Sequence, residues 1–362
     1  MKLTSKLFFI FTLYSSICIS QNMKEGFTFL ETGKYKKAVV FFKNILIEYP
    51  KNKTAKLCFG RAIGLNGNSK KAVEIFTDLL KNYPNDFEIK LNYAESLLWN
   101  KDYTKAKSYY QNLVKEDSKN FPALLGFANT LSNLKTYDLA LEYVNKALVV
   151  SPGNLNALIS KKYIYLGYAN QYAQKRDYKA SINLLNDNLL LFKNDTETLQ
   201  NLANVYLISN DLTKAKEAYQ TIGESSSNKL VSLNGLALVS HLNGKEKEAL
   251  KISSKAMNLI NDQTEKRIAK QTRERYVQAL IWNRKYVEAE TQIKKLIEKH
   301  PNKNWTLLLR ATLNIYKSDF EKSLSDYNRV IKNDSTSFDG NLGKANALKA
   351  SKLYNEAYRA AN

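Results

Sequence analysis

The sequence predicts an all-α protein built from stacked pairs of helices. Small residues recur along the chain at intervals of about 34, and a second set of small residues precedes the first by 12. Pro50, Pro84, Pro152 and Pro301 each follow a member of the first set by 12 residues, where a proline would end a helix. Each interval accommodates one helix pair, so the sequence is typical of a repeat array.

The first set of small residues defines the length of the repeat. Its members are Ala38, Ala72, Ala106, Ala140, Ala180, Ala215, Ala249, Ala289, Ser323 and Ala357. They lie 34, 34, 34, 40, 35, 34, 40, 34 and 34 residues apart, so two repeats carry six extra residues each. We expect each addition to lengthen a first helix, within residues 154–175 and 262–284. The added turns either form a ledge for a partner or are neutral length variation.

The other recurrent positions predict how the helices pack. The second set of small residues is Gly26, Gly60, Ala94, Ala128, Ala203, Ala237, Ala311 and Ala345. Large residues follow the first set by four, at Phe42, Phe76, Tyr110, Val144, Leu184, Tyr219 and Ile293. Residues four apart share a helix face. We therefore expect the small residues to let two helices approach closely, and the large ones to fill the space to the next repeat.

A 34-residue helix pair with these marks resembles the tetratricopeptide repeat (TPR) family. The segments that carry the resemblance best are residues 33–50, 101–106 and 134–152, and tyrosines recur at the turn between the two helices. The resemblance covers nearly the whole mature chain. It implies a right-handed α-solenoid of about ten helix-turn-helix units, with the first helices lining the concave face.

The predicted domain organisation is a signal peptide followed by one TPR superhelix. The superhelix covers residues 21–362, with units near 19–52, 53–86, 87–120, 121–154, 155–195, 196–229, 230–263, 264–303, 304–337 and 338–362. The last unit is incomplete and has no polar capping helix. We therefore expect either that the natural chain continues past Asn362 or that a partner or second copy covers this end.

The first 20 residues have the pattern of a secretory signal peptide. Lys2 and Lys6 precede an apolar run over residues 7–19, and cleavage after Ser20 would start the mature chain at Gln21. Lipidation at Cys18 is not expected, because Ile17 stands where a lipoprotein signal has a small residue. No later segment is apolar enough to predict a transmembrane anchor. The expected location is periplasmic or outer-membrane associated, in the cell envelope.

The charge balance argues against nucleic acid as a partner. The formal net charge is +21, from 55 Lys and Arg against 34 Asp and Glu, and 46 of the 55 are lysines spread over every unit. Nucleic-acid sites favour clustered arginines with interleaved aromatic residues. A dispersed positive charge is instead compatible with attraction to an acidic polysaccharide or to the envelope surface.

No motif in the sequence predicts catalysis, a metal site or a cofactor. His241 and His300 have no ligand pattern around them, and the glycines are single rather than gathered in a phosphate-binding loop. After signal cleavage Cys58 is the remaining cysteine, and we expect it to be a small buried apolar residue. The sequence therefore predicts that the protein is not an enzyme.

The first helices carry a row of amide side chains, and TPR arrays bind through these helices. The candidate groove residues are Asn92, Glu95, Trp99, Asn129, Asn133, Gln200, Asn201, Asn204, Asn234, Gln278, Trp282 and Asn346. Amides can bond a peptide backbone or sugar hydroxyls, and an indole can stack on a ligand. The alternative is that asparagine is merely abundant and the tryptophans close a helix turn.

The family's lysine- and asparagine-based clamp for terminal carboxylates is not reproduced here. Its positions are occupied by Leu57 and Arg61 in one unit and by Leu91 and Glu95 in the next. The first functional hypothesis is therefore a scaffold of the cell envelope that binds protein partners or peptide segments in its groove. The alternative is the periplasmic TPR portion of an outer-membrane polysaccharide-export or barrel-assembly system, suggested by the segment at residues 95–103.

Overall fold

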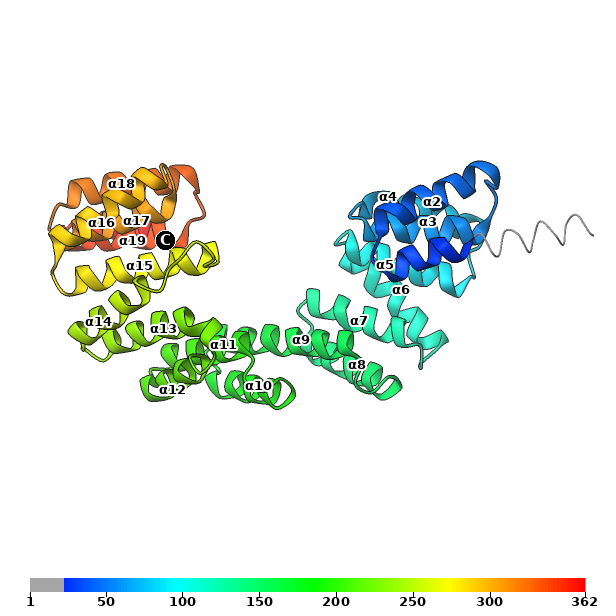
Figure 1. Cartoon of the computed structure of the whole chain (residues 1–362), viewed down its shortest axis with the longest axis horizontal. Coiled ribbons are helices and arrows are strands. Elements are labelled where there is room, and N and C mark those ends of the chain that lie inside the picture. The colour runs from blue at the N-terminus through cyan, green and yellow to red at the C-terminus, as the bar shows by residue number, and fades with distance from the viewer. Residues whose placement is uncertain (1–22, 362) are drawn as a thin grey trace, which may run out of the picture. The chain divides into compact units, whose positions relative to one another are not determined.

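The described part of the chain is all-α, as the sequence predicts. The computed structural model describes residues 23–361, and consecutive helices run antiparallel to one another in pairs (Figure 1). The predicted signal peptide, its cleavage site after Ser20 and Cys18 lie outside the described residues.

Each repeat consists of a first and a second helix. Residues 23–31 are helical and precede α2. The later first helices are α3 (Lys53–Leu65), α5 (Phe87–Trp99), α7 (Phe121–Asn133), α9 (Leu155–Gln174), α11 (Thr196–Ile208), α13 (Lys229–Leu242), α15 (Lys266–Trp282), α17 (Asn304–Tyr316) and α19 (Phe338–Ala350). The second helices are α2 (Tyr35–Glu48), α4 (Ser69–Asn82), α6 (Tyr103–Glu116), α8 (Tyr137–Val150), α10 (Tyr178–Leu191), α12 (Leu212–Ile222), α14 (Glu246–Met257), α16 (Tyr286–Lys299), α18 (Phe320–Asn333) and α20 (Tyr354–Ala361). A short 3₁₀ turn, η1 (Ser226–Asn228), precedes α13.

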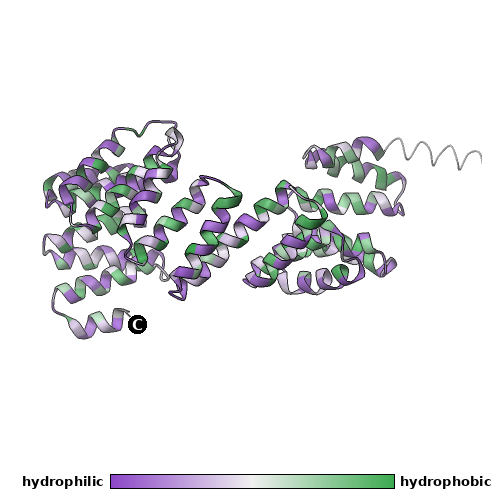
Figure 2. Ribbon diagram, turned by 90° about the horizontal axis from the view of Figure 1, so that it is seen from below, coloured by the Kyte–Doolittle hydropathy of each residue, from purple (hydrophilic) through white to green (hydrophobic). Residues whose placement is uncertain are grey.

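The chain divides into two compact bodies, which we call the N-terminal body (to residue 171) and the C-terminal body (from residue 172). In each body a second helix packs on the first helix of its own repeat and on that of the next, as α6 does on α5 and α7 and α14 does on α13 and α15. First helices of successive repeats also touch, for example α13 and α15. Figure 2 shows hydrophobic and hydrophilic residues alternating along the helices, as this two-sided packing requires.

The predicted close approach between paired helices is confirmed. Ala38, Ala72, Ala106 and most later members of the first set are 0 % exposed, and every member of the second set is buried. In one repeat the two helices are joined by a hydrogen bond, which the Ser323 hydroxyl of α18 donates to the Ala311 carbonyl of α17 at 2.9 Å. Small residues at both positions are what allow the two backbones to come this close.

The predicted register was wrong by one residue in the fifth repeat. Ala180 and Leu184 are partly exposed, whereas Ser181 and Leu185 are 0 % exposed. α10 begins at Tyr178, so Ser181 occupies the fourth position, as Ala38 does in α2. The insertion before this repeat is therefore seven residues rather than six, and Ala169 fills the missing place of the second set with 1 % exposure.

Both predicted insertions do lengthen a first helix. α9 has 20 residues and α15 has 17, whereas α3, α5, α7, α11, α17 and α19 each have 13. Within residues 23–361, none of the helices combines the length and the apolar character needed to span a bilayer.

Candidate functional site

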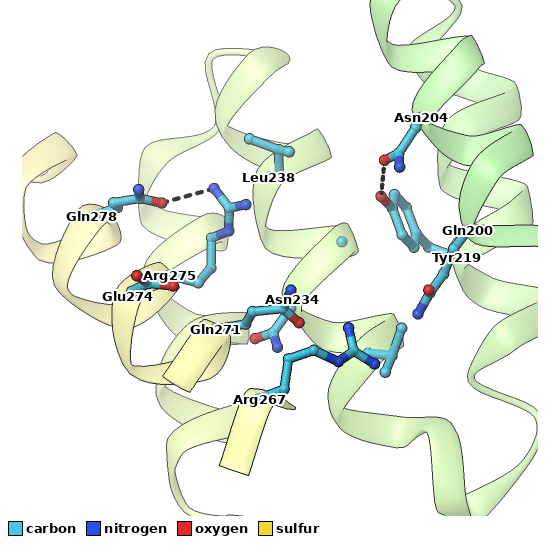
Figure 3. A pocket seen from close by; sticks show the side chains of 12 residues that line it. Gln200, Asn204, Tyr219, Asn234, Leu238, Arg267, Gln271, Glu274, Arg275 and Gln278 are labelled. Carbon is cyan, nitrogen blue, oxygen red and sulfur yellow. Dashed lines mark hydrogen bonds between the residues drawn. The ribbon is translucent and has the colours of Figure 1, made fainter. Parts of the chain in front are cut away.

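A polar pocket of about 370 Å³ lies within the C-terminal body. Its floor comes from α13 and its two sides from α11 and α15 (Figure 3). The lining residues are Gln200 and Asn204 from α11, Tyr219 from α12, Val231, Asn234, Gly235 and Leu238 from α13, and Arg267, Gln271, Glu274, Arg275 and Gln278 from α15. These residues recur every three or four positions, so each helix presents one face to the pocket.

The pocket gathers four of the predicted groove residues. Gln200, Asn204, Asn234 and Gln278 all line it, although they come from three different repeats. Sequence periodicity placed them on first helices, and the stacking of α11, α13 and α15 brings them to one site. Tyr219, Arg267 and Arg275 were not predicted.

Tyr219 reaches the pocket because the next helix leaves room for its ring. A β-carbon at Gly235 would overlap the ring, so only glycine permits this contact. The Ser232 hydroxyl also donates to the Tyr219 carbonyl at 2.6 Å, which fixes α12 on α13. Burial raises the pKa of the Tyr219 phenol, and Arg275 opposes the shift, so the hydroxyl is neutral at physiological pH.

Hydrogen bonds within the pocket orient its amides. The Tyr219 hydroxyl donates to Asn204 Oδ1 at 3.3 Å. Asn234 Nδ2 donates to Thr272 Oγ1 at 2.9 Å, and the Thr272 hydroxyl donates in turn to the Ile268 carbonyl at 2.9 Å. This arrangement leaves Asn234 Oδ1 buried and without a hydrogen bond from the described residues.

Arg275 is the central charge of the pocket. Its Nη1 donates to Gln278 Oε1 at 2.9 Å, whereas its buried Nε has no partner among the described residues. Burial lowers the pKa of the guanidinium, against the opposing effects of Tyr219 and Glu274. Burial likewise raises the pKa of Glu274, while Lys270, with its Nζ 3.5 Å from Glu274 Oε1, lowers it.

Trp282 supports the pocket from behind rather than lining it. Its ring stacks on the His241 ring with centroids 3.6 Å apart, and the Arg275 guanidinium lies 5.8 Å from the indole centroid. His241 Nδ1 contacts Glu246 Oε2 at 2.7 Å, which orients the imidazole. Trp282 therefore contacts Arg275 and helps to hold it in place, while it is not itself among the lining residues.

Trp99 has the same architectural role in the N-terminal body. It ends α5 as Trp282 ends α15, and a β-carbon at Gly64 would overlap its ring, so the indole packs back on the preceding first helix. Both tryptophans thus pack against side chains or backbone of a neighbouring first helix.

Other predicted groove residues do not join the pocket. Asn92 is 4 % exposed, because the sixth residue of α5 faces the neighbouring helices inside the body. Its Nδ2 donates to the Glu88 carbonyl of its own helix. Asn133 and Asn201 also bond their own helices, through the carbonyls of Asn129 and Glu197. Asn129 and Glu95 are half-buried, whereas Asn133 and Asn346 are exposed.

Glu95 lies in a partly buried cluster of the N-terminal body, with Arg61 and Tyr110. Burial raises its pKa, and the nearby Arg61 guanidinium opposes the shift. Glu95 in turn contributes to the raised pKa of Tyr110, whose main cause is burial. Arg61 Nε is buried without a hydrogen bond from any described residue. Tyr110, Glu95 and Arg61 thus repeat the combination of a tyrosine, a carboxylate and an arginine found at Tyr219, Glu274 and Arg275.

A recurrent pair of residues could have revealed the tyrosines from sequence. Glycine follows tyrosine by 16 residues at Tyr110 and Gly126, at Tyr219 and Gly235, and at Tyr327 and Gly343. In all three pairs a β-carbon on the glycine would overlap the tyrosine ring. Fifteen residues before each tyrosine stands a polar residue, Glu95, Asn204 or Thr312, and the latter two lie within 3.4 Å of the phenolic oxygen.

No set of three or more His, Cys, Asp or Glu side chains that could hold a metal occurs among residues 23–361. Cys58 is 4 % exposed and its thiol is free, as predicted for a small buried residue. Burial raises the pKa of this thiol to about 11, so it is protonated at neutral pH.

Comparisons with known proteins agree with the repeat periodicity. The family model described as tetratricopeptide repeat matches residues 66–121, and a second model of the same description matches residues 196–222. No protein among the curated sequences matches this chain.

Solved structures share the fold at low sequence identity. The yeast Tom70 structure matches with a TM-score of 0.50 at 14% identity, covering 94% of this chain and 90% of that one. A tetratricopeptide repeat protein from Parabacteroides merdae gives a TM-score of 0.44 at 16% identity, over 70% of this chain and 98% of that one. At such identities the Tom70 match shows the fold alone.

Proposed function

We propose that the chain is a tetratricopeptide repeat protein and a non-enzymatic scaffold, which holds a segment of a partner protein in the α11, α13 and α15 pocket. The observation that carries this proposal is the convergence of Gln200, Asn204, Asn234 and Gln278 on one pocket. Side-chain amides both donate and accept, so they can satisfy the main chain of an extended segment.

Blocking the pocket tests this proposal. Gln271 is an exposed lining residue, and Gln271→Trp would fill the opening without disturbing the packed side of α15. The unaltered chain should capture partners from an envelope fraction, and these should crosslink to α11, α13 or α15. We expect Gln271→Trp to lose those partners. Asn346→Trp is the matched control, because Asn346 is exposed on a first helix of the same body but outside the pocket. Equal capture by both variants would refute the proposed site.

We also propose that the protein is exported to the cell envelope. The support is the N-terminal sequence, in which Lys2 and Lys6 precede the apolar run at residues 7–19. Amino-terminal sequencing of the protein from its native cells should find Gln21 first, and Phe9→Lys should leave the chain uncleaved. A mature protein that begins at Met1 would contradict export.

The same capture experiment separates the scaffold from the alternative role in export or assembly. One soluble protein that survives moderate salt would favour the scaffold. Recovery of polysaccharide or of outer-membrane assembly components would favour the periplasmic portion of an export or barrel-assembly system.

A further inference from the structure

Two of the pocket amides, Asn204 and Gln278, have their oxygens occupied and their N–H groups free. Asn204 Oδ1 already accepts from the Tyr219 hydroxyl, so the Asn204 Nδ2 group keeps its N–H bonds for another partner. Gln278 Oε1 likewise accepts from Arg275, which leaves the Gln278 Nε2 group. Asn234 differs, because its free acceptor is a buried atom. A ligand that complements the accessible atoms of Asn204 and Gln278 must therefore supply acceptors.

The pocket also holds a positive charge, Arg275, that no carboxylate of the described residues binds directly. Among the described residues Arg275 forms no ion pair, and its one hydrogen bond goes to the neutral amide of Gln278. The adjacent carboxylate of Glu274 attracts Arg275 but makes its ion pair with Lys270, with 3.5 Å between Oε1 and Nζ. The buried Nε of Arg275 therefore keeps a free N–H. A charge-assisted hydrogen bond from it to an anion would offset the cost of burying the guanidinium.

A second arginine stands at the opening. Figure 3 shows Arg267 extending from α15 beside Gln271 and Asn234, and its side chain is largely exposed. Its Nε donates to Glu265 Oε1 at 3.2 Å, and both side chains are more than half exposed. Exposed pairs of this kind are weak, so Arg267 can exchange Glu265 for an incoming anion.

We infer that the pocket takes a carboxylate carried by the partner segment, with Arg275 as its counter-ion and Asn204 and Gln278 as donors to the neighbouring acceptors. This inference rests on the proposed function and specifies its ligand. A volume of about 370 Å³ is at the lower end of known ligand pockets. It suits one side chain with its flanking main chain.

Peptide pools test the carboxylate directly. One pool is a set of heptapeptides, capped by acetyl and amide groups, with Glu at the centre and neutral residues randomised elsewhere. The other pool has Gln at the centre. We expect the full chain to bind the Glu pool about tenfold more tightly, the factor that a change of 1.4 kcal/mol in binding free energy produces. Pools that end in a free carboxylate or an amide show whether a terminal group serves equally well.

Three variants locate the effect. Arg275→Gln should abolish the preference for the Glu pool, whereas Arg284→Gln removes the same charge from an exposed turn outside the pocket and should keep it. Gln278→Glu supplies Arg275 with an internal carboxylate and should also abolish the preference. This last variant keeps the test valid if Arg275→Gln fails to fold.

Defined outcomes would overturn the inference. Equal binding of the Glu and Gln pools refutes the carboxylate but leaves the pocket as a peptide site. Failure of both pools to bind also refutes it, and the blocking experiment with Gln271→Trp then shows whether the scaffold proposal falls too. A uronic acid oligomer that competes for the pocket more strongly than the Glu pool would show that the ligand is an acidic glycan and not a peptide.

Discussion

Gly235 lies where a side chain would displace the ring that closes one side of the pocket. The ring atoms nearest its missing β-carbon include Tyr219 Cγ, which cannot swing away without moving the tyrosine as a whole. Glycine normally weakens a helix relative to alanine. At Gly235 the overlap of an added methyl group with the Tyr219 ring outweighs the gain in helix propensity that alanine would bring.

We predict that Gly235→Ala destabilises the protein by about 1–3 kcal/mol, as overpacking of a core usually does. It should also weaken peptide binding, because Tyr219 can no longer hold Asn204. Urea denaturation and the peptide pools measure the two effects.

Gly343→Ala is the matched control, because it creates the same overlap with Tyr327 outside the pocket. It should destabilise the chain similarly and leave peptide binding unchanged. The double variant Gly235→Ala, Tyr219→Leu should lose less free energy of unfolding than the two single variants lose together, since the two residues are in contact. Additive losses would show that the ring and the glycine are not coupled.

Glu95 is predicted to make stability depend on pH. Burial raises its pKa above the ordinary value of 4.5, so the folded chain binds this proton more tightly than the unfolded chain. The contribution to stability is complete below pH 4.5 and is lost as pH rises through the folded pKa. We therefore expect Glu95→Gln to be more stable than the unaltered chain at pH 7, with little difference near pH 4.

Urea midpoints at several pH values test this sign. Glu224→Gln changes an exposed carboxylate and should not alter the pH dependence. A Glu95→Gln variant less stable than the unaltered chain at pH 7 would mean that attraction to Arg61 exceeds the cost of burial.

At the scale of the helix pair, one backbone position shapes every repeat. Two residues before each second helix the chain has positive φ, at Gly33, Gly67, Lys101, Lys135, Arg176, Asn210, Gly244, Arg284, Ser318 and Lys352. This conformation ends the first helix and starts the turn to the second. Between Lys101 and Ser318, six of these positions carry Lys, Arg, Asn or Ser instead of glycine. Residues with a side chain disfavour positive φ, so the backbone of these turns is strained.

We predict opposite effects at two of these turns. At Gly67 φ is +96° and a β-carbon would meet no atom within 4 Å, so Gly67→Ala tests the backbone alone. It should destabilise by about 1–2 kcal/mol. Lys101→Gly should stabilise by up to about 1 kcal/mol, because relief of the strained φ exceeds the added entropy of the unfolded chain.

Amide hydrogen exchange in the flanking helices measures both changes. Protection in α3 and α4 should fall in Gly67→Ala, and protection in α5 and α6 should rise in Lys101→Gly. Changes of the same sign in both variants would contradict this account of the turn.

At the scale of the whole molecule, the net charge of +21 is the dominant feature. Many of the lysines that form ion pairs do so with an acid three or four residues away on an exposed helix surface, as Lys71 does with Glu74. Such pairs contribute little. The remaining positive charges repel one another, which destabilises the compact state.

We predict that sodium chloride raises the thermal midpoint between about 0.01 and 0.15 M, over which the screening length falls from about 30 to 8 Å. Sodium fluoride should act equally if screening is the cause. A midpoint that falls with salt would indicate that ion pairs outweigh the net repulsion.

The repeat could be predicted from the amino-acid sequence alone. Small residues such as Ala38 and Ala94, the closing prolines and the turn tyrosines are local requirements of a helix pair, so they recur with a period that can be read along the chain. The same reasoning failed at Ala180, because an insertion interrupts the period and only burial shows that Ser181 is the packed residue.

The candidate site, in contrast, became visible only when the helices were stacked in three dimensions. Asn129 and Asn204 are each the ninth residue of a first helix, yet only Asn204 lines the pocket. Arg275 became its centre because the longer α15 stacks on α13, which places that helix face opposite α11. A repeat pattern specifies which face of a helix is apolar, whereas the polar groups that meet depend on how successive repeats stack, and no single repeat encodes that.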